Sequence, residues 1–203
     1  MNNSITVIGD VHGKYKLYHE IIRQTKYVPY SVQLGDFGFK YETLDNVDPY
    51  KHKVIGGNHD NYSSIINIPH YLGDFGYSCL NGVDFFYYRG AYSIDKQYRT
   101  IGVDWWAEEQ LSAEQFMEAR KLYRKVKPKI VITHDCPELL YSYYLRPTDK
   151  IYQNQTSYFL NELYNIHQPD LWIHGHWHLS KTTKMEITKF VCIGELQTYT
   201  IQC

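Results

Sequence analysis

The stretch Ile5-Thr6-Val7-Ile8-Gly9-Asp10-Val11-His12-Gly13 decides how the rest of the sequence is interpreted. Its first four residues form an apolar run typical of a buried strand, and Asp10 and His12 follow where that strand ends. Residues two apart in an extended segment point to the same side, and the flanking glycines permit a sharp turn. A shared target for these two side chains indicates a metal ion. For the pair alone, an Asp that caps the next helix beside a surface His is the commoner explanation.

Length and charge bound the class of protein. The chain has 203 residues and no repeat, low-complexity tract or Pro/Ser linker, so we predict a single domain over residues 1–203. Its 21 Lys and Arg nearly balance 22 Asp and Glu, so no general basic field attracts nucleic acid or an anionic membrane. The sequence starts without a basic and apolar leader, and no apolar stretch is long enough to span a bilayer. We therefore expect a cytoplasmic protein with no membrane partner.

The cysteines and histidines carry different information. The four cysteines are far apart and form no Cys-x-x-Cys pair, which favours small buried thiols over a structural zinc site or a disulfide framework. They are Cys79, Cys136, Cys192 and Cys203. Six of the ten histidines follow apolar runs at glycine or turn residues, namely His12, His59, His134, His174, His176 and His178. This clustering is the second indication of a metal site.

Four more apolar runs end in polar residues, as the first one does. These runs and the residues that follow them are 31–34 with Asp36, 53–55 with Asn58, His59 and Asp60, 129–133 with His134, and 170–173 with His174, His176 and His178. Parallel α/β sheets place their ligand sites at the carboxyl ends of the strands. We therefore expect these five segments to meet at one edge.

Helical and hairpin patterns account for most of the remaining chain. Apolar spacing predicts helices over residues 14–26, 138–145 and 156–166, and Ser112 with Gln115 predicts a capping-box start for another that ends before Pro128. Asn81-Gly82 between aromatic segments predicts a hairpin in a second, more antiparallel sheet. Residues 184–201 alternate and are expected to close that second sheet.

The polar residues at the five strand ends form a ligand set of oxygen and imidazole without thiolate. The seven candidate ligands are Asp10, His12, Asp36, Asn58, His134, His176 and His178. Such ligands suit Mn, Fe, Zn or, less well, Mg. Seven ligands exceed what one tetrahedral ion needs, and a central carboxylate such as Asp36 can bridge two ions about 3.5–4 Å apart. Two divalent metal ions are therefore expected, with Mn favoured.

The order of these motifs resembles that of the calcineurin-like metallophosphoesterases, especially small stand-alone members from bacteria and phages. The motifs that carry the resemblance are Gly9-Asp10-x-His12-Gly13, Gly35-Asp36, Gly56-Gly57-Asn58-His59-Asp60, the strand-end His134 and Gly175-His176-x-His178. The resemblance implies an α/β fold, a four-layer α-β-β-α sandwich of two mixed sheets flanked by helices. It also implies one metal on Asp10, His12, Asp36 and His178, and another on Asp36, Asn58, His134 and His176. His174 receives no ligand role, which favours either a histidine that supports a metal ligand or one that is packed in the interior.

The resemblance further implies hydrolysis of phosphoesters, by a phosphatase or a phosphodiesterase, with a metal-bridging hydroxide as nucleophile. His59 adjoins a ligand without being one, so we expect it to protonate the leaving oxygen as general acid, with Asp60 holding the imidazolium. Asn58 and Arg99 are the expected substrate-binding residues. For Arg99, an ion pair with Asp95 is an equal alternative.

Departures from related branches bear on the substrate. The Asp-Arg-Gly and Asn-His-Glu motifs of protein Ser/Thr phosphatases are replaced here by Asp36-Phe37-Gly38 and by Asn58-His59-Asp60, and no basic path of a nuclease is visible. A small phosphorylated substrate is expected, and a phosphoprotein or a nucleic acid is the alternative. Asp36-Phe37-Gly38 also mimics a kinase motif, but its companion motifs are missing. A non-catalytic interaction module is the remaining alternative, against which the intact ligand set argues.

Overall fold

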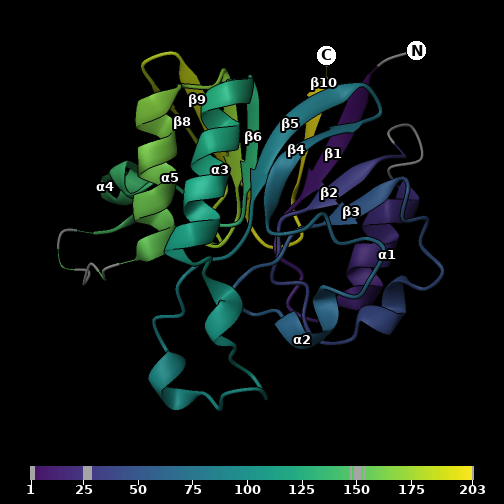
Figure 1. Cartoon of the computed structure of the whole chain (residues 1–203). Coiled ribbons are helices and arrows are strands. Elements are labelled where there is room, and N and C mark those ends of the chain that lie inside the picture. The colour runs from purple at the N-terminus through teal and green to yellow at the C-terminus, as the bar shows by residue number, and fades with distance from the viewer. Residues whose placement is uncertain (1–2, 25–28, 147, 149–151, 153, 203) are drawn as a thin grey trace.

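Two β-sheets face each other at the centre of the structure, with helices on both outer faces (Figure 1). The computed structural model describes residues 3–24, 29–146, 148, 152 and 154–202. The strands are β1 (Ser4–Ile8), β2 (Ser31–Gln33), β3 (His52–Val54), β4 (Phe75–Leu80), β5 (Val83–Tyr88), β6 (Ile130–Thr133), β7 (Leu171–His174), β8 (Lys181–Met185), β9 (Thr188–Cys192) and β10 (Thr198–Gln202). The α-helices are α1 (Tyr15–Gln24), α2 (Tyr62–Ile65), α3 (Ala113–Val126), α4 (Tyr141–Tyr144) and α5 (Gln155–Ile166). The predicted four-layer sandwich is confirmed.

The first sheet has the strand order β10-β1-β2-β3. β1, β2 and β3 are parallel, and β10 runs antiparallel to β1 with Ser4 opposite Gln202. The expectation that residues 184–201 all close the second sheet is therefore wrong for β10. The chain crosses over after β9 because Leu196 donates its N–H to the carbonyl of Asp10, and Gly9 donates its N–H to that of Gln197, which places β10 beside β1.

The second sheet is mixed and has the order β4-β5-β6-β7-β9-β8. β4 and β5 form the predicted antiparallel hairpin, whose turn residues Asn81 and Gly82 have φ values of 49° and 73°. Positive φ at both central residues gives the twist that two-residue hairpins favour. The strands from β5 through β6 and β7 to β9 are parallel, and β8 pairs antiparallel with β9. The parallel centre gives this sheet the strand ends that a site requires.

Three apolar layers hold the sandwich together. Between the sheets, Val7 and Val32 of the first sheet pack in one cluster with Phe85 and Ile173 of the second, and all four are fully buried. The residue before Ile173 in β7, Trp172, points the other way and packs in the cluster under α3 and α5. A third cluster lies under α1 and α2. The central strands β6 and β7 are therefore buried on both faces, as the continuous apolar runs in the sequence indicate.

The predicted helices are present, with small changes in extent. Ser112 and Gln115 form the predicted capping box at the start of α3. The helix expected over residues 14–26 is described as α1, and its last two expected residues lie outside the described ranges. Residues 138–145 begin as a 3₁₀ turn, Glu138–Leu140, and continue as α4. Among the helices within the described ranges, none combines the length and the apolar character that crossing a membrane requires.

The cysteine expectation is partly wrong. Cys136 and Cys192 are buried free thiols, but Cys79 is exposed, because it lies on the open face of the β4–β5 hairpin. Cys203 lies outside the described residues.

Candidate metal centre

The carboxyl ends of β1, β2, β3, β6 and β7 lie at one edge of the sandwich (Figure 1), and the predicted metal ligands follow these strand ends. Backbone hydrogen bonds join the segments that follow these strands: His12 donates its N–H to the carbonyl of Asp36 at 2.8 Å, and Gly175 donates to that of His134 at 3.0 Å. A further hydrogen bond, from the N–H of His176 to Asp10, joins segments 166 residues apart in the chain. The predicted meeting of the strand ends is confirmed.

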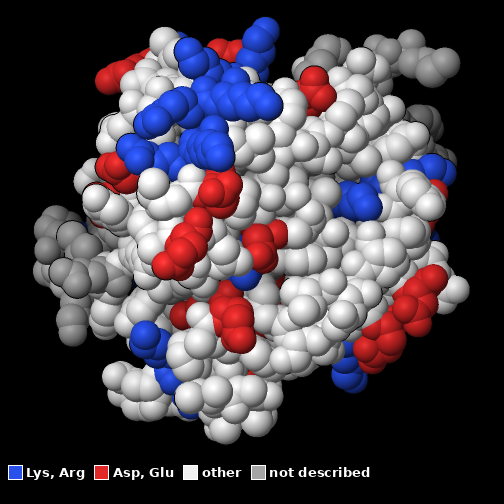
Figure 2. Space-filling view, in the orientation of Figure 1, with Lys and Arg blue, Asp and Glu red and all other residues white. Residues whose placement is uncertain are grey.

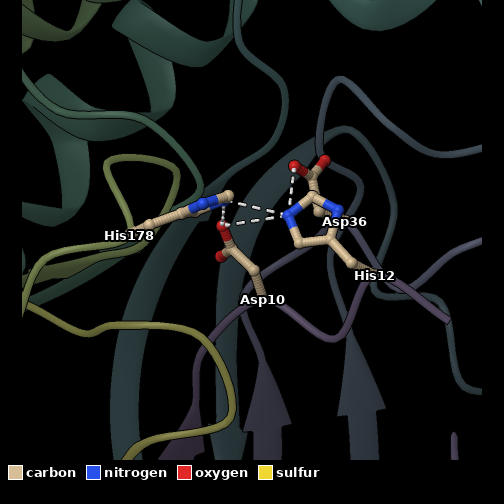
Figure 3. Close-up of side chains that lie close together, drawn as sticks. All are labelled: Asp10, His12, Asp36 and His178. Carbon is tan, nitrogen blue, oxygen red and sulfur yellow. Dashed lines mark hydrogen bonds and ion pairs between the residues drawn. The ribbon is translucent and has the colours of Figure 1, made fainter. Parts of the chain in front are cut away.

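One cluster contains Asp10, His12, Asp36 and His178, as Figure 3 shows. The Nε2 atoms of His12 and His178 lie 2.9 Å apart. Nε2 of His178 is 3.2 Å from Oδ2 of Asp10, and Nε2 of His12 is 3.6 Å from Oδ2 of Asp36. The carboxylates are buried, whereas the His178 side chain is 49% exposed, so the cluster opens to solvent on the imidazole side.

A second cluster shares Asp36 with the first and adds Asn58, His134 and His176. Nε2 of His134 lies 3.4 Å from Oδ1 of Asp36 and 3.1 Å from Oδ1 of Asn58. Ligand atoms of Asp36, His134 and His176 all lie within 4.8 Å of one another. The two oxygens of Asp36 thus face different clusters, Oδ2 toward His12 and Oδ1 toward His134.

Left-handed backbone conformations concentrate at these clusters. His12, Asp36, His176 and His178 have φ values of 45°, 54°, 64° and 52°. Such a conformation is uncommon for residues other than glycine and costs roughly 1–3 kcal/mol at each position. The surrounding hydrogen bonds and packing must hold these residues in place, and backbone strain of this kind clusters at functional sites.

The close approach of the segments depends on glycine at two positions. A Cβ atom on Gly57 would collide with Oδ1 of Asp36, and one on Gly175 would collide with Oδ1 of Asp10. The glycines before Asn58 and His176 therefore let the backbone pass directly beside the carboxylates. His176 also donates its N–H to both oxygens of Asp10, at 3.3 and 3.1 Å.

The hydrogen bonds around His134 show that the second cluster fits a cation. Nδ1 of His134 lies 2.7 Å from the carbonyl of Leu34, which only accepts, so Nδ1 carries the proton and Nε2 presents a lone pair. That lone pair faces Oδ1 of Asn58 and Oδ1 of Asp36. Three electron-rich atoms converge without a hydrogen between them, an arrangement that a positive ion stabilises.

Asn58 is oriented by a chain of buried hydrogen bonds. Its Nδ2 donates to Oγ of Ser93 at 3.1 Å, and that hydroxyl donates to Oε2 of Glu109 at 2.6 Å. Ser93 and Glu109 are both buried. Because the hydroxyl proton is given to Glu109, Ser93 accepts from the amide, and Oδ1 of Asn58 must turn toward His134. Sequence inspection did not single out this pair, since nothing in the order of residues links positions 58, 93 and 109.

The pKa values of the two central carboxylates, Asp10 and Asp36, are shifted in opposite directions. For Asp10 burial works to raise the pKa, but the hydrogen bond from His178 and the nearby His134 and His176 together hold it below its usual value. For Asp36, burial followed by the negative charges of Asp10 and Asp60 raises the pKa well above its usual value. Positive charge at this point would favour the ionised form of Asp36, which agrees with a cation site.

Asp60 occupies a different place from the one expected. Its Oδ1 accepts from the N–H groups of Phe37 and Gly38 and from the hydroxyl of Tyr41, and its Oδ2 accepts from the N–H groups of Asp36 and Gly57. No hydrogen bond or ion pair joins Asp60 to His59 within the described residues. The expected pairing is therefore wrong, because the buried backbone of the Asp36 loop, with Gly57 and Tyr41, offers Asp60 five donors. Burial raises the pKa of Asp60 to about 6, and these donors oppose that shift.

His59 contacts Arg99 instead. Nη2 of Arg99 lies 2.8 Å from Nε2 of His59 and 2.8 Å from Oδ2 of Asp95. The Arg99–Asp95 ion pair, one of the two alternatives for Arg99, is thus present. Because a guanidinium only donates, Nε2 of His59 accepts and the imidazole is neutral. Burial, together with the cation of Arg99, lowers the pKa of His59 to about 3.

His174 does not join the clusters. It is fully buried, and its Nε2 lies 2.9 Å from the hydroxyl of Tyr144. Of the two alternatives that the sequence leaves for His174, this is the packed histidine.

A cleft of about 410 Å³ opens beside the two clusters. Asp36, Asn58, His59 and His176 lie at its inner end, and aromatic residues including Tyr92, Tyr141 and Trp177 form its sides. Sequence inspection missed these aromatic residues. The position of Trp177 between His176 and His178 was the one available signal.

Comparison with known proteins identifies the family. The model for the calcineurin-like phosphoesterases matches residues 4–180. Among curated proteins, none matches the sequence significantly. Solved structures share the fold at low identity: phosphopantetheinyl hydrolase PptH from Mycobacterium tuberculosis has 13% identity and a TM-score of 0.57, covering 95% of this chain and 89% of that chain. TT1561 of Thermus thermophilus has 11% identity and a TM-score of 0.54, covering 100% of this chain and 99% of that chain.

A third solved structure, GAP50, described as the anchor in the inner membrane complex of Plasmodium, has 14% identity and a TM-score of 0.55, covering 95% of this chain and 71% of that chain. At such identities these likenesses show the fold alone. The family match extends over most of the chain, so the protein belongs to the calcineurin-like phosphoesterase family. It is a hydrolase that acts on phosphoric ester bonds.

The hydrogen bonds of Asp60 give a test of stability. Replacing Asp60 by Asn puts an amide NH₂ where a carboxylate oxygen accepts from backbone N–H groups, so at least one buried donor loses its partner. We expect Asp60→Asn to lower the free energy of unfolding of the metal-free protein by roughly 1–3 kcal/mol, measured by urea denaturation at pH 7.5. Asp170→Asn, at an exposed position, is the matched control and should change it by less than about 0.5 kcal/mol. Equal effects of the two variants would contradict the structural role of Asp60.

Proposed function

We propose that the protein is a dinuclear metallophosphoesterase in which Asp36 is shared by two divalent cations. The observation that carries the proposal is the placement of the two Asp36 oxygens, one 3.6 Å from Nε2 of His12 and the other 3.4 Å from Nε2 of His134. Asp10, His12, Asp36 and His178 would hold one ion, and Asp36, Asn58, His134 and His176 the other. When bound, the cations make water a competent nucleophile near neutral pH and offset the charge of the transferring phosphoryl group.

The donor chemistry supports manganese as the metal. The clusters offer carboxylate, amide and imidazole atoms, and the described cysteines lie outside them. Oxygen and nitrogen donors without thiolate suit Mn, Fe or Zn, and an octahedral preference for oxygen favours Mn. Burial also lowers the pKa of His134 to about 4, so its imidazole is neutral and available as a ligand at physiological pH.

Arg99 and His59 are the proposed groups for the phosphoryl oxygens and the leaving group. His59 lines the inner end of the cleft, and Arg99 donates to it. A phosphate that enters beside them is a better acceptor for the guanidinium than the imidazole is. Its negative charge would also raise the pKa of His59, which would let the imidazole carry a proton to the leaving oxygen. The Asp95 carboxylate keeps the guanidinium at this position.

The charge distribution supports a small substrate. Figure 2 shows Lys and Arg gathered over the upper end of α3, whose last turn carries Arg124 and Lys125, with acidic side chains below them. Cations at the carboxyl end of a helix are favoured by its dipole, which explains this gathering locally. The described residues that line the cleft include no lysine or arginine, so these residues offer no basic path for a polyanion. We therefore propose a small phosphorylated molecule as substrate in preference to a phosphoprotein or nucleic acid.

Hydrolysis of chromogenic esters tests the proposal. The Mn²⁺-loaded protein is expected to hydrolyse 4-nitrophenyl phosphate, its bis-ester or both, and Asp36→Asn should lower kcat at least about 10²-fold because the shared carboxylate is lost. Asp170→Asn serves as the matched control. A flat result with both esters at full metal occupancy would contradict the proposal and favour a non-catalytic module.

Removal of the His59 imidazole separates its role from that of a ligand. We expect His59→Ala to reduce turnover by roughly 10²–10⁴-fold with phenyl phosphate, a poor leaving group, and by less with 4-nitrophenyl phosphate, because proton donation matters most when the leaving oxygen is basic. Metal content, measured by inductively coupled plasma mass spectrometry, should stay unchanged. Loss of metal together with activity would instead make His59 a ligand.

A further inference from the structure

The cleft beside the metal clusters has a built aromatic wall. Tyr141 and Trp177 have ring centroids 5.0 Å apart, and Tyr144 packs against Trp177 with their ring centroids 5.2 Å apart. Tyr92 and Ile94, in the segment after β5, also line the cleft. Aromatic and aliphatic side chains of this kind do not stabilise a phosphate group, but they fit a ring or another flat apolar group.

A fully buried carboxylate fixes this wall. Oδ1 of Asp135 accepts from Nε1 of Trp177 at 3.1 Å, and Oδ2 accepts from Nδ2 of Asn154 and from Oγ of Ser157, each at 2.7 Å. The hydroxyl of Tyr141 donates to the same Ser157 oxygen at 2.7 Å. Asp135 thus sets the positions of both rings, directly or through Ser157. Because it directly follows His134, one chain segment serves both the metal cluster and the cleft.

The Tyr92 ring is held by a residue of the same segment, Lys96. Nζ of Lys96 lies 4.6 Å from the centroid of the Tyr92 ring, within cation–π range. Ser93, the next residue, accepts a hydrogen bond from Asn58 of the second cluster and donates one to Glu109. The position of Tyr92 is therefore coupled to the inner end of the cleft. A group bound there would meet preformed aromatic surfaces, which lowers the entropy cost of binding.

We infer that the cleft binds a flat ring carried by the alcohol part of the phosphoester, as the base is carried in a nucleoside monophosphate. The inference rests on the proposed function, since the phosphoryl group must lie at the clusters for the alcohol part to extend along the cleft. A volume of about 410 Å³ is in the range of ligand pockets for small molecules. Any base can stack on aromatic side chains, so we expect the cleft to favour substrates with a ring without distinguishing one base from another.

Two substrates with the same leaving alkoxide test this assignment. AMP and ribose 5-phosphate both release a 5′-hydroxyl, but only AMP carries a base. We expect the Mn²⁺-loaded protein to show a kcat/KM for AMP at least about 10-fold above that for ribose 5-phosphate, a size that stacking of one base supplies. Tyr92→Ala should reduce this ratio at least about 3-fold. Tyr50→Ala, at a tyrosine that is 84% exposed outside the cleft, should leave the ratio unchanged.

A binding measurement adds a readout that is independent of turnover. With Mg²⁺ in place of the paramagnetic Mn²⁺, adenosine should shift the indole N–H resonance of Trp177, which is assigned by its loss in Trp177→Phe, and ribose should not. A preference for AMP that survives Tyr92→Ala undiminished, or an indole signal that ignores adenosine, would overturn the cleft assignment.

Failure of the ring-binding inference and failure of the proposed function give different experimental results. Equal kcat/KM values for AMP and ribose 5-phosphate would overturn the ring-binding inference while leaving the phosphoesterase intact. Absence of hydrolysis of both, and of 4-nitrophenyl phosphate, at full metal occupancy would overturn the proposed function itself.

Discussion

The hydrogen bonds that Asp60 accepts are the constraint on which the candidate centre depends. A fully buried carboxylate gathers the N–H groups of Asp36, Phe37 and Gly38 on one loop and of Gly57 on the next. This arrangement locks Asp36 in a left-handed conformation that its own preferences disfavour. With Asp36 fixed, its two oxygens face the two imidazole clusters, and the geometry that supports two cations follows. A surface Asp could not serve in this way, because water would compete for the same donors.

The sandwich supplies the rigidity around this constraint. Val32 and Ile173 in opposed sheets pack in one buried layer, so the strand ends on both sides of the site are held in register. Close-packed interiors resist displacement, which suits a site whose ligand atoms lie within 4.8 Å of one another. The cleft is held in a similar way, because the buried carboxylate of Asp135 accepts a hydrogen bond from Trp177, as that of Asp60 does from Asp36. Buried carboxylates with saturated hydrogen bonds thus organise both the centre and the proposed substrate wall.

Much of this could be predicted from the sequence, for a physical reason. Apolar runs followed by Gly-Asp or Gly-His locate strand ends, and parallel strands bring those ends together, so the clustering of Asp10, Asp36 and His176 followed from local patterns. The partner of Asp60 could not be predicted, because its five donors include four backbone N–H groups, which carry no sequence signature. β10 joins the first sheet because the chain after β9 crosses to it and is hydrogen-bonded to Gly9. The alternation of apolar and polar residues in β10 does not specify which sheet it joins. The aromatic cleft joins residues as distant as Tyr92 and Trp177, and only folding reveals that proximity.

Anomalous diffraction from crystals grown with Mn²⁺ tests the central claim most directly. Two anomalous peaks are expected, one on each side of the Asp36 carboxylate and about 3.5–4 Å apart, with Asn58 and His134 beside one and His12 and His178 beside the other. A single peak, or peaks that do not contact Asp36, would contradict the shared carboxylate and with it the proposed dinuclear centre.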